Sequence, residues 1–554
     1  MSQDSLMRKF TSTATKIFGM NPSCQKATKN IQMKRNLLIG AFVLLSCYSF
    51  SQVPEDVLKY SWQPTNGTAR VTAIGGAMGS LGGDISANLV NPAGLGFFKT
   101  REIVLSPGYS FLNNKSNFRG TNASEKDKYF NLGTTGFVTG WAGRGKWKSQ
   151  AFSIGITRTA NFSNTVYYTG KNDFSSQAEQ YAAEIASSGI DIGFIPDNRS
   201  LSYGSRMASY NFLVDTTTLA GNATPDVISM AMWGQLKEGG DFLVDQSQLI
   251  ETSGGITDIA FGYAANMDDK LYIGGSLSFS VVKYKRETTF REQDATSNID
   301  NNFNFSELSE TYKTKGVGGT IRLGVIAKPT EFVRLGFAVH SPTFYSLEDT
   351  YHGKMVTDLD SFRSVPGPHT IESNQLPGED SDPVYKYELN SPWKFLLSGS
   401  YVLREIEDVR KQKGFITADV EYVTYGSNRF WQASSYATDG EEAYYKDVNN
   451  VIKDYYKGAF NFRVGGELKF TTLMTRLGFS YYGSPYSDKE LKANRMFVSG
   501  GLGYRNAGIF IDLTYQHALQ KDVNFPYRLS DKANTFAAIK GNGSNVMLTF
   551  GFKI

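Results

Sequence analysis

A glycine-rich stretch, GTARVTAIGGAMGSLGGDISANLVNPAGLGFF (residues 67–98), is where residue types and spacing first suggest a binding site. Glycine-rich loops can hold phosphate groups, but a P-loop also needs a lysine followed by a hydroxyl residue, and a dinucleotide loop needs G-x-G-x-x-G. This stretch contains no lysine, and the dinucleotide spacing does not fit its central glycines, which are Gly75, Gly76, Gly79, Gly82 and Gly83. Apolar residues alternate with these glycines. We therefore expect tight backbone packing here instead of phosphate binding.

Other patterns for chemistry are weak. The only cysteines are Cys24 and Cys47, and the four histidines form no H-x-x-H pair, so we expect no metal site and no cofactor. No G-x-S-x-G motif occurs, and we expect neither a catalytic site nor an enzyme. A net charge of +4 over 554 residues gives no electrostatic footprint for nucleic acid.

The N-terminus predicts export. Residues 33–51 have a basic start at Lys34 and Arg35, a short apolar run and a small-residue cleavage site, as in a secretory signal peptide. Residues 1–32 are interpreted as an extension from a start codon placed too early. A lipoprotein signal ending at Cys47 is a competing interpretation, less favoured because its apolar run would be short. The mature chain is expected to begin near residue 52.

The body of the chain alternates between apolar and polar residues with a period of two. The clearest case is the C-terminus, where one face carries Val546, Leu548, Phe550, Phe552 and Ile554. This pattern is typical of lipid-facing strands in outer-membrane barrels. About fourteen strands are expected, near 102–112, 129–142, 148–160, 255–266, 270–285, 315–327, 332–343, 392–404, 413–425, 459–470, 474–483, 495–505, 508–517 and 544–554.

The connections between these strands alternate between short and long. The long ones are 161–254, 286–314, 344–391, 426–458 and 518–543. Short turns on one side and long loops on the other indicate an all-β, transmembrane antiparallel barrel spanning 102–554, and a soluble β-sandwich predicts no such alternation. Within 161–254, helices are expected at 174–186 and at 224–237, where Thr224 and Pro225 resemble a helix start. These helices could form a lid over the barrel or simply pack within the loop.

Charged residues alternate with the apolar rows and are expected to face a wet lumen as structural charges. They are Arg322, Asp419, Glu421, Arg463, Glu467, Lys469, Arg476 and Asp512. Unpaired charges facing lipid would cost several kcal/mol near the midplane, so the lumen is the favoured side.

The chain resembles the FadL/TodX family of outer-membrane transporters for long-chain fatty acids and other hydrophobic compounds. The glycine-rich stretch carries the most specific likeness, through its Asn91-Pro92-Ala93-Gly94 motif; weaker blocks are LGFAVHSPTF (335–344), SPWKFLLSGSYVL (391–403), ADVEYVTYGSNRF (418–430) and RLGFSYYGSPY (476–486). The resemblance implies a fourteen-stranded barrel. It also implies that residues 52–101 fold inside the lumen as a hatch, with Asn91-Pro92-Ala93 turning the chain into the first strand.

The same resemblance implies passive, hatch-gated uptake of a fatty acid or similar hydrophobic ligand across the outer membrane of a Gram-negative bacterium, in contact with its lipid. One alternative is a barrel that scaffolds protein secretion or surface assembly, with partners bound through the 161–254 segment. Another is a haem receptor, because His352 and His369 lie in a long outer segment and haem iron takes a histidine ligand.

Overall fold

The computed structural model describes residues 56–219, 225–296, 298, 301–360, 362, 367–403, 413–433, 439–488 and 494–554. The predicted extension 1–32, the predicted signal peptide 33–51 and Thr224 lie outside the described residues.

The described elements begin inside the barrel and then form its wall. The N-terminal segment (residues 56–98) contains α3 (Asp56–Ser61), α4 (Ala69–Ala73), α5 (Ala87–Val90) and the 3-10 helix η1 (Pro92–Phe97). Next come β1 (Arg101–Leu105), β2 (Pro107–Phe118), β3 (Thr121–Leu132), β4 (Thr135–Ala142), β5 (Trp147–Asn161), β6 (Asn164–Asn172), α6 (Ala178–Ser188), η2 (Ile192–Phe194), α7 (Tyr203–Tyr210), β7 (Val214–Thr217), β8 (Asp226–Ser229), η3 (Met230–Met232), α8 (Trp233–Glu238), β9 (Val244–Met267), β10 (Leu271–Asp294) and β11 (Phe305–Ala327). The rest are β12 (Val333–His340), β13 (Phe344–Asp358), β14 (His369–Glu372), η5 (Ser373–Gln375), β15 (Val384–Asn390), β16 (Lys394–Leu403), β17 (Gly414–Thr424), η7 (Tyr425–Ser427), β18 (Arg429–Gln432), α9 (Asp439–Tyr455), β19 (Gly458–Phe470), β20 (Leu473–Tyr482), β21 (Arg495–Asn506), β22 (Ile509–Asn524) and β23 (Ala537–Lys553).

The strands close into a barrel with fourteen antiparallel positions in the described part of the chain. Six positions are shared by two successive strands, namely β1 with β2, β3 with β4, β5 with β6, β12 with β13, β15 with β16 and β17 with β18. The last strand, β23, pairs with β22 on one side and with β1 and β2 on the other. The predicted fold class is therefore confirmed. Each predicted strand has a counterpart in the wall.

An apolar belt surrounds one part of the barrel. On β10, the outward side chains Ile273, Leu277, Phe279 and Val281 are exposed. The inward side chains of the same segment are buried, and they include Ser276, Ser278 and Ser280. Outward apolar residues with polar inward neighbours are the pattern of a strand between lipid and lumen.

Beyond this belt the strands continue much further than the sequence predicted. β10 and β11 stay paired from Leu271↔Ala327 to Gln293↔Phe305. The segments 286–314, 344–391 and 518–543, predicted as loops, are therefore largely strand. Outward positions on β10 change there from apolar residues to Lys283, Lys285 and Glu287. The alternation of apolar outward residues ends with the belt, whereas the backbone pairing of β10 with β11 continues beyond it.

The link between the strands predicted at 102–112 and 129–142 was also expected to be a long loop, and this is wrong. β2 and β3 continue through it and form a tight hairpin, with register Phe118↔Thr121. The two turn residues, Arg119 and Gly120, have φ angles of +48° and +84°. Positive φ at both central residues is the geometry of a type I′ turn, which matches the twist of paired strands.

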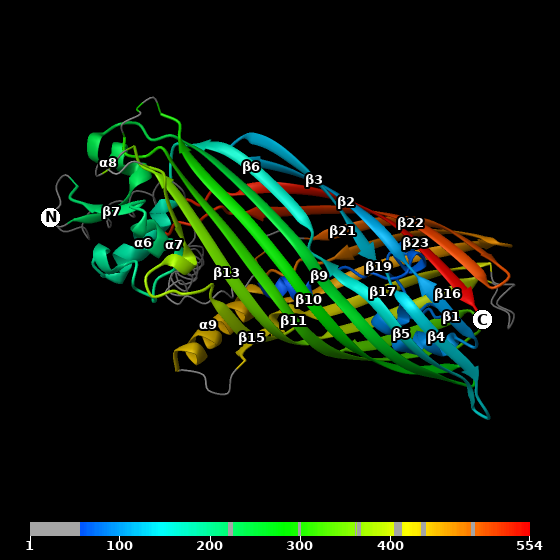
Figure 1. Cartoon of the computed structure of the whole chain (residues 1–554). Coiled ribbons are helices and arrows are strands. Elements are labelled where there is room, and N and C mark those ends of the chain that lie inside the picture. Colours follow the sequence, from blue (N-terminus) through cyan, green and yellow to red (C-terminus); the bar gives the residue numbers. More distant parts are fainter. Residues whose placement is uncertain are drawn as a thin grey trace, which may run out of the picture.

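A cap, defined as residues 173–243, covers the end of the barrel away from the C-terminus (Figure 1). Its apolar core includes Ile185, Met207 and Met230, and it also takes in Phe303 and Met355 from beside the barrel strands. The predicted helix at 174–186 is observed as α6. The helix predicted at 224–237 is wrong at its start, because residues 226–229 form β8, which pairs with β7. Its later part is helical, as η3 followed by α8.

No helix in the described ranges is both long and apolar enough to span a membrane.

Candidate functional site

The N-terminal segment lies inside the barrel and is bound to its wall through backbone groups. The Asp419 carboxylate accepts hydrogen bonds from the N–H groups of Met78 (3.0 Å) and Gly79 (3.1 Å). Thr549 Oγ1 accepts a hydrogen bond from the Ala69 N–H at 2.8 Å, and Ser499 donates one to the Ala73 carbonyl at 3.1 Å. A segment with little regular structure thus has its buried backbone groups paired by wall side chains, as burial requires.

The hatch glycines predicted from the sequence fall into two groups. Gly75, Gly76 and Gly83 have φ between +66° and +77°, a region that favours glycine. Gly79, Gly82 and Gly94 are instead close-packed: a Cβ at Gly79 would lie 2.7 Å from Ser398 Cβ, and one at Gly94 would lie 2.8 Å from the Leu81 carbonyl oxygen. At Gly82 a Cβ would overlap the Phe97 ring. At each of these positions a side chain would be strained by the φ angle or would clash with a neighbour.

Wall glycines matter as much, and the sequence analysis missed them. A Cβ at Gly274 would lie 2.5 Å from the Pro92 carbonyl carbon. A Cβ at Gly324, Gly336 or Gly478 would overlap Asn91, Gly79 or Gly75 respectively. Glycine appears on the inward face where the segment touches the wall, because no side chain fits between the two backbones.

The Asn91-Pro92-Ala93 motif caps a helix. Asn91 Oδ1 accepts a hydrogen bond from the Ala93 N–H at 3.1 Å, and Pro92 occupies the first position of η1. Asn91 Nδ2 donates to the Gly79 carbonyl at 2.6 Å and to the Val325 carbonyl of β11 at 3.3 Å. The motif was expected to turn the chain into the first strand. The motif lies earlier: it starts η1, because an Asn cap followed by Pro starts a helix, and the rest of η1 and residues 98–100 separate it from β1.

Most of the predicted lumen charges meet in two networks. Arg476 binds Asp512 (2.5 Å) and Glu467 (2.6 Å), and Glu467 also lies 3.4 Å from Arg70 of the N-terminal segment. Arg463 lies 3.3 Å from Glu421 and donates a hydrogen bond to Thr65 Oγ1 at 2.7 Å.

Three further predicted lumen charges can be placed. Asp419 lies 3.8 Å from Arg463. Arg322 pairs separately with Asp258, at 3.2 Å. Lys469 is half-buried on β19, where its backbone N–H bonds Lys413.

A polar cavity of about 110 Å³ lies between the N-terminal segment and the wall. Its lining includes Asn66, Arg322, His340, Lys394, Glu421 and Arg463. Lys394 makes no hydrogen bond or ion pair within the described residues, whereas Arg322 and Arg463 are paired. Glu421 lines the same cavity and interacts electrostatically with Lys394, so Lys394 has a charged neighbour there but no direct polar contact among the described residues.

An aromatic layer adjoins this cavity on the side toward the cap. It consists of α3 residues with side chains from the wall and α9, including Tyr60, Trp62, Tyr345, Tyr425, Phe430 and Tyr445. Tyr60 and Tyr345 border both the layer and the cavity. The Arg495 guanidinium lies 3.8 Å from the Trp62 ring centroid, and Lys59 Nζ lies 4.1 Å from that of Tyr284. The first helix of the described residues, α3, thus packs in an apolar part of the lumen.

The wall is broken beside the cavity. The ladder between β4 and β5 ends at Thr135↔Ile156, and in the described part of the chain β3 pairs only with β2. Further from the belt, β6 packs against β2 and β3 through side chains, such as Asn114 Nδ2 donating to the Thr165 carbonyl at 2.6 Å. Phe130 and Ile156 are exposed on the two sides of the break. Two adjacent strands therefore have no backbone bonds to each other over this stretch.

Asn66 closes the break from inside. Its Nδ2 donates to the Arg158 carbonyl of β5 at 2.7 Å and to the Leu132 carbonyl of β3 at 3.2 Å. The neighbouring Gly67 carbonyl accepts a hydrogen bond from the Thr134 N–H at 3.1 Å. Sequence analysis missed Asn66, because it precedes the glycine-rich motif and only the pairing of distant strands reveals its role. Lys394 was missed for the same reason.

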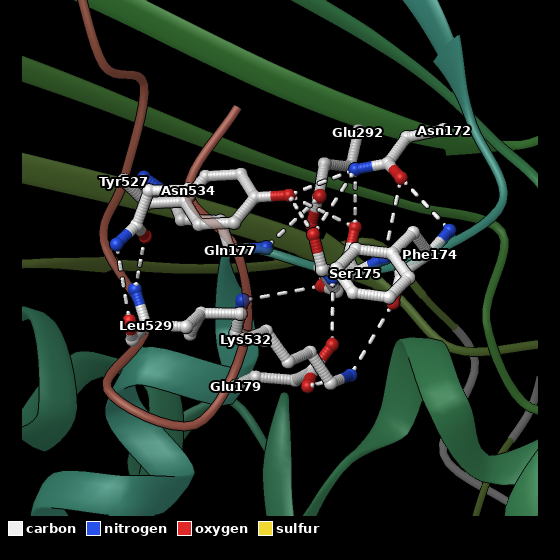
Figure 2. Close-up of polar contacts among 12 residues, drawn as sticks. Asn172, Phe174, Ser175, Gln177, Glu179, Glu292, Tyr527, Leu529, Lys532 and Asn534 are labelled. Atoms are coloured by element: carbon white, nitrogen blue, oxygen red, sulfur yellow. Dashed lines mark hydrogen bonds and ion pairs between the residues drawn. The ribbon is translucent and has the colours of Figure 1, made fainter. Parts of the chain in front are cut away.

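The cap is joined to the barrel through a buried carboxylate (Figure 2). Glu292 of β10 accepts hydrogen bonds from Ser176 Oγ (2.7 Å), the Gln177 N–H (3.0 Å) and Gln246 Nε2 (2.5 Å). Burial raises the pKa of Glu292 to about 7, even though these hydrogen bonds act in the opposite direction. Figure 2 also shows Tyr527 bound to Asn172 and Ser175, and Lys532 paired with Glu179.

The histidines considered for haem binding are on the strands beside the cap. The Nδ1 of His352 lies 2.8 Å from Asp382 and its Nε2 lies 3.9 Å from Glu372. Carboxylates thus face both ring nitrogens. His369 is half-buried on β14 and pairs with Thr357 of β13. Nothing in this arrangement favours the haem-receptor hypothesis.

Comparisons with known proteins give likenesses of fold only. No protein-family model and no curated protein sequence matches the chain. Among solved structures, it is similar to a FadL homologue of Pseudomonas aeruginosa, with a TM-score of 0.49 at 12% identity over 89% of this chain and 99% of that chain. It is similar to the toluene transporter TodX of P. putida, with a TM-score of 0.48 at 13% identity over 89% of this chain and 99% of that chain. It is also similar to the toluene transporter TbuX of Ralstonia pickettii, with a TM-score of 0.43 at 13% identity over 89% of this chain and 100% of that chain.

Proposed function

We propose that the protein is a passive channel for hydrophobic compounds, such as long-chain fatty acids, in the outer membrane of a Gram-negative bacterium. The observation that carries the proposal is the break in the wall between β3 and β5, which among the described residues is closed by side chains and by Asn66 and Gly67 of the internal segment. A side opening suits an apolar ligand, because it leads into lipid without passing through water.

The order of the layers suggests the route. A ligand would first occupy the aromatic layer and displace α3, and it would then pass the polar cavity toward the break. Asn66 lines that cavity and also bonds to both edges of the break. Movement of the N-terminal segment would therefore empty the apolar layer and open the side exit together. No energy source is needed when the ligand moves down its gradient.

Replacing Asn66 with alanine tests this exit. The change removes hydrogen bonds to β3 and β5, each worth about 1 kcal/mol, so opening should become up to about fivefold easier per bond lost. Uptake of radiolabelled oleate and of toluene would be measured in cells that express the protein and lack another uptake route. Asn117→Ala is the control, because Asn117 is an exposed amide on β2 whose side chain bonds Asn122 within the same hairpin, away from the break.

Faster uptake in Asn66→Ala alone supports the side exit. If the intact protein gives no more uptake than cells without it and retains no apolar compound on purification, the channel proposal is wrong. Protein partners co-purifying through the 161–254 segment would then favour the assembly scaffold, a role that the separate apolar core of the cap suits.

A further inference from the structure

A second break in the wall lies next to α9. The ladder between β17 and β19 ends at Thr424↔Gly458. Beyond it, within the residues that the structure describes, β18 pairs with β15 alone, through Leu389↔Phe430 and its neighbours. The other edge of β18 faces α9 in place of a strand.

Asn449 of α9 takes the place of the missing strand. Its Oδ1 accepts a hydrogen bond from the Phe430 N–H at 2.8 Å, and its Nδ2 donates to the Phe430 carbonyl at 2.9 Å. An amide has one acceptor and two donor hydrogens, so it can satisfy both backbone groups of one strand residue. A single side chain thus fastens the helix to this edge.

The two faces of α9 differ. Tyr444, Tyr445, Val448 and Ile452 are buried and belong to the aromatic layer that surrounds α3. On the other side, charged residues including Lys446 and Lys453 are exposed. α9 is therefore an amphipathic helix whose apolar face packs on the aromatic layer of the lumen. It lies at the barrel wall near β15 (Figure 1).

A groove of about 640 Å³ runs between α9 and the wall. Phe344 and Trp431 line it and are 62% and 42% exposed, as outward residues continuous with the apolar belt. Phe430 and Tyr445 also line it, and both are members of the aromatic layer. The groove therefore reaches from the lipid-facing surface to the apolar lumen, and the bond between Asn449 and Phe430 lies between the two.

We propose that this groove is a lateral inlet for a single-chain amphiphile dissolved in the outer leaflet, with α9 as its gate. The groove volume is in the range of small-molecule sites. Its aromatic residues suit an alkyl chain, and Glu388, Glu442 and Lys446 supply a polar rim where a head group stays hydrated. The inference rests on the proposed function and adds a route by which ligand enters from the membrane instead of from water.

A single thiol can report on the groove. Residues 52–554 contain no cysteine, so Gln432→Cys in the groove would be the only labelling site of the mature chain. The variant would carry a bimane label in phospholipid vesicles, and 9,10-dibromostearate would be added as quencher. Lys453→Cys is the control, because Lys453 is exposed on α9 and does not line the groove.

Dibromostearate should quench the label at 432 at least about fivefold more strongly than at 453, which corresponds to a preference of about 1 kcal/mol. Unbrominated stearate should relieve that quenching. Equal quenching at the two positions would overturn the inlet proposal. The proposal would also be overturned if brominated phospholipid quenches the label at 432 and stearate does not relieve this quenching, because the groove would then hold only bulk lipid.

Failure of the inlet differs from failure of the channel. If stearate still binds to the detergent-solubilised protein but dibromostearate does not quench the label at 432, the inlet proposal is wrong and the channel proposal still stands. Asn449→Leu provides a second measurement, because loss of the bond to Phe430 should speed the quenching at 432 by several-fold. Unchanged kinetics in that variant would mean that α9 is not a gate.

Discussion

Asn66 makes hydrogen bonds to β3 and β5, two strands that share no backbone ladder within the described residues. Asn449 acts in a similar way at the free edge of β18. Each is a short amide with donors and an acceptor, so it can pair backbone groups where a ladder stops. A bond from a side chain can break without unravelling a strand. Amides at wall breaks are therefore suited to gates.

Lys394 is the residue that should distinguish ligand classes. It is a cation without a hydrogen-bonding partner among the described residues, and it lines the polar cavity. A carboxylate paired with it would gain a charge-assisted bond worth about 1.5–3 kcal/mol, so Lys394→Met should weaken oleate binding by about tenfold or more. Toluene binding, which uses no charge, should not change.

Both affinities would be measured on the purified protein by displacement of a fluorescent apolar probe. Lys413→Met is the matched control, because Lys413 is an exposed lysine next to β17 that does not line the cavity. An equal loss for oleate and toluene would indicate a damaged cavity, and no loss for either would remove Lys394 from the ligand path.

Among the elements, the existence of the wall strands was the easiest feature to predict from the sequence, and the length of these strands was the hardest. The part of β10 that faces lipid could be recognised from its alternating apolar residues Ile273, Leu277 and Phe279. Further along the same face the alternation ends, because Lys283 and Glu287 are charged. Local pattern thus identifies a strand only where one face meets lipid. Pairing between β3 and β5, and the role of α9, depend on residues far apart in the sequence, and no local period encodes them.

The attachment of the cap should depend on pH through Glu292. Its pKa of about 7 in the folded protein lies above the ordinary value near 4.5, so the folded state binds more protons between these two values. Stability of the cap contact is then greatest below about pH 4.5 and declines as pH rises to about 7, by about 3 kcal/mol in total.

Hydrogen exchange of α6, corrected for the intrinsic rate, would be followed by mass spectrometry from pH 5 to pH 8. Protection should fall with rising pH in the native protein and stay level in Glu292→Gln, which cannot ionise. Glu251→Gln, an exposed site on β9, should behave as the native protein does. A native profile without slope, or the same slope in Glu292→Gln, would contradict the account.

For the whole molecule, the barrel and its internal segment could be predicted from the sequence, whereas the content of the lumen could not. The C-terminal alternation and the Asn91-Pro92-Ala93 motif carried the first prediction. Neither motif nor composition indicated that the lumen holds an aromatic layer next to a polar cavity, because these residues come from α3, α9 and strands across the barrel.

Removing the N-terminal segment should turn the barrel into an open pore. A barrel of eight strands is already filled by its own side chains, so one of fourteen has a lumen that needs additional chain to close it. Here residues 56–98 fill it, and wall groups such as Asp419 and Thr549 bind that segment's backbone. No ladder bond of β1 to β23 requires residues 52–95, so a variant lacking them should still close its wall.

We expect this variant to carry a steady ion current in a planar bilayer, with the full-length mature chain nearly silent. Without the segment, the inward charges of Glu467, Arg476 and Asp512 would be solvated by water, which makes the pore ion-conducting. Heat-dependent migration on a denaturing gel would show whether the variant has folded. A folded variant that stays silent would mean that the cap, and not the internal segment, closes the lumen.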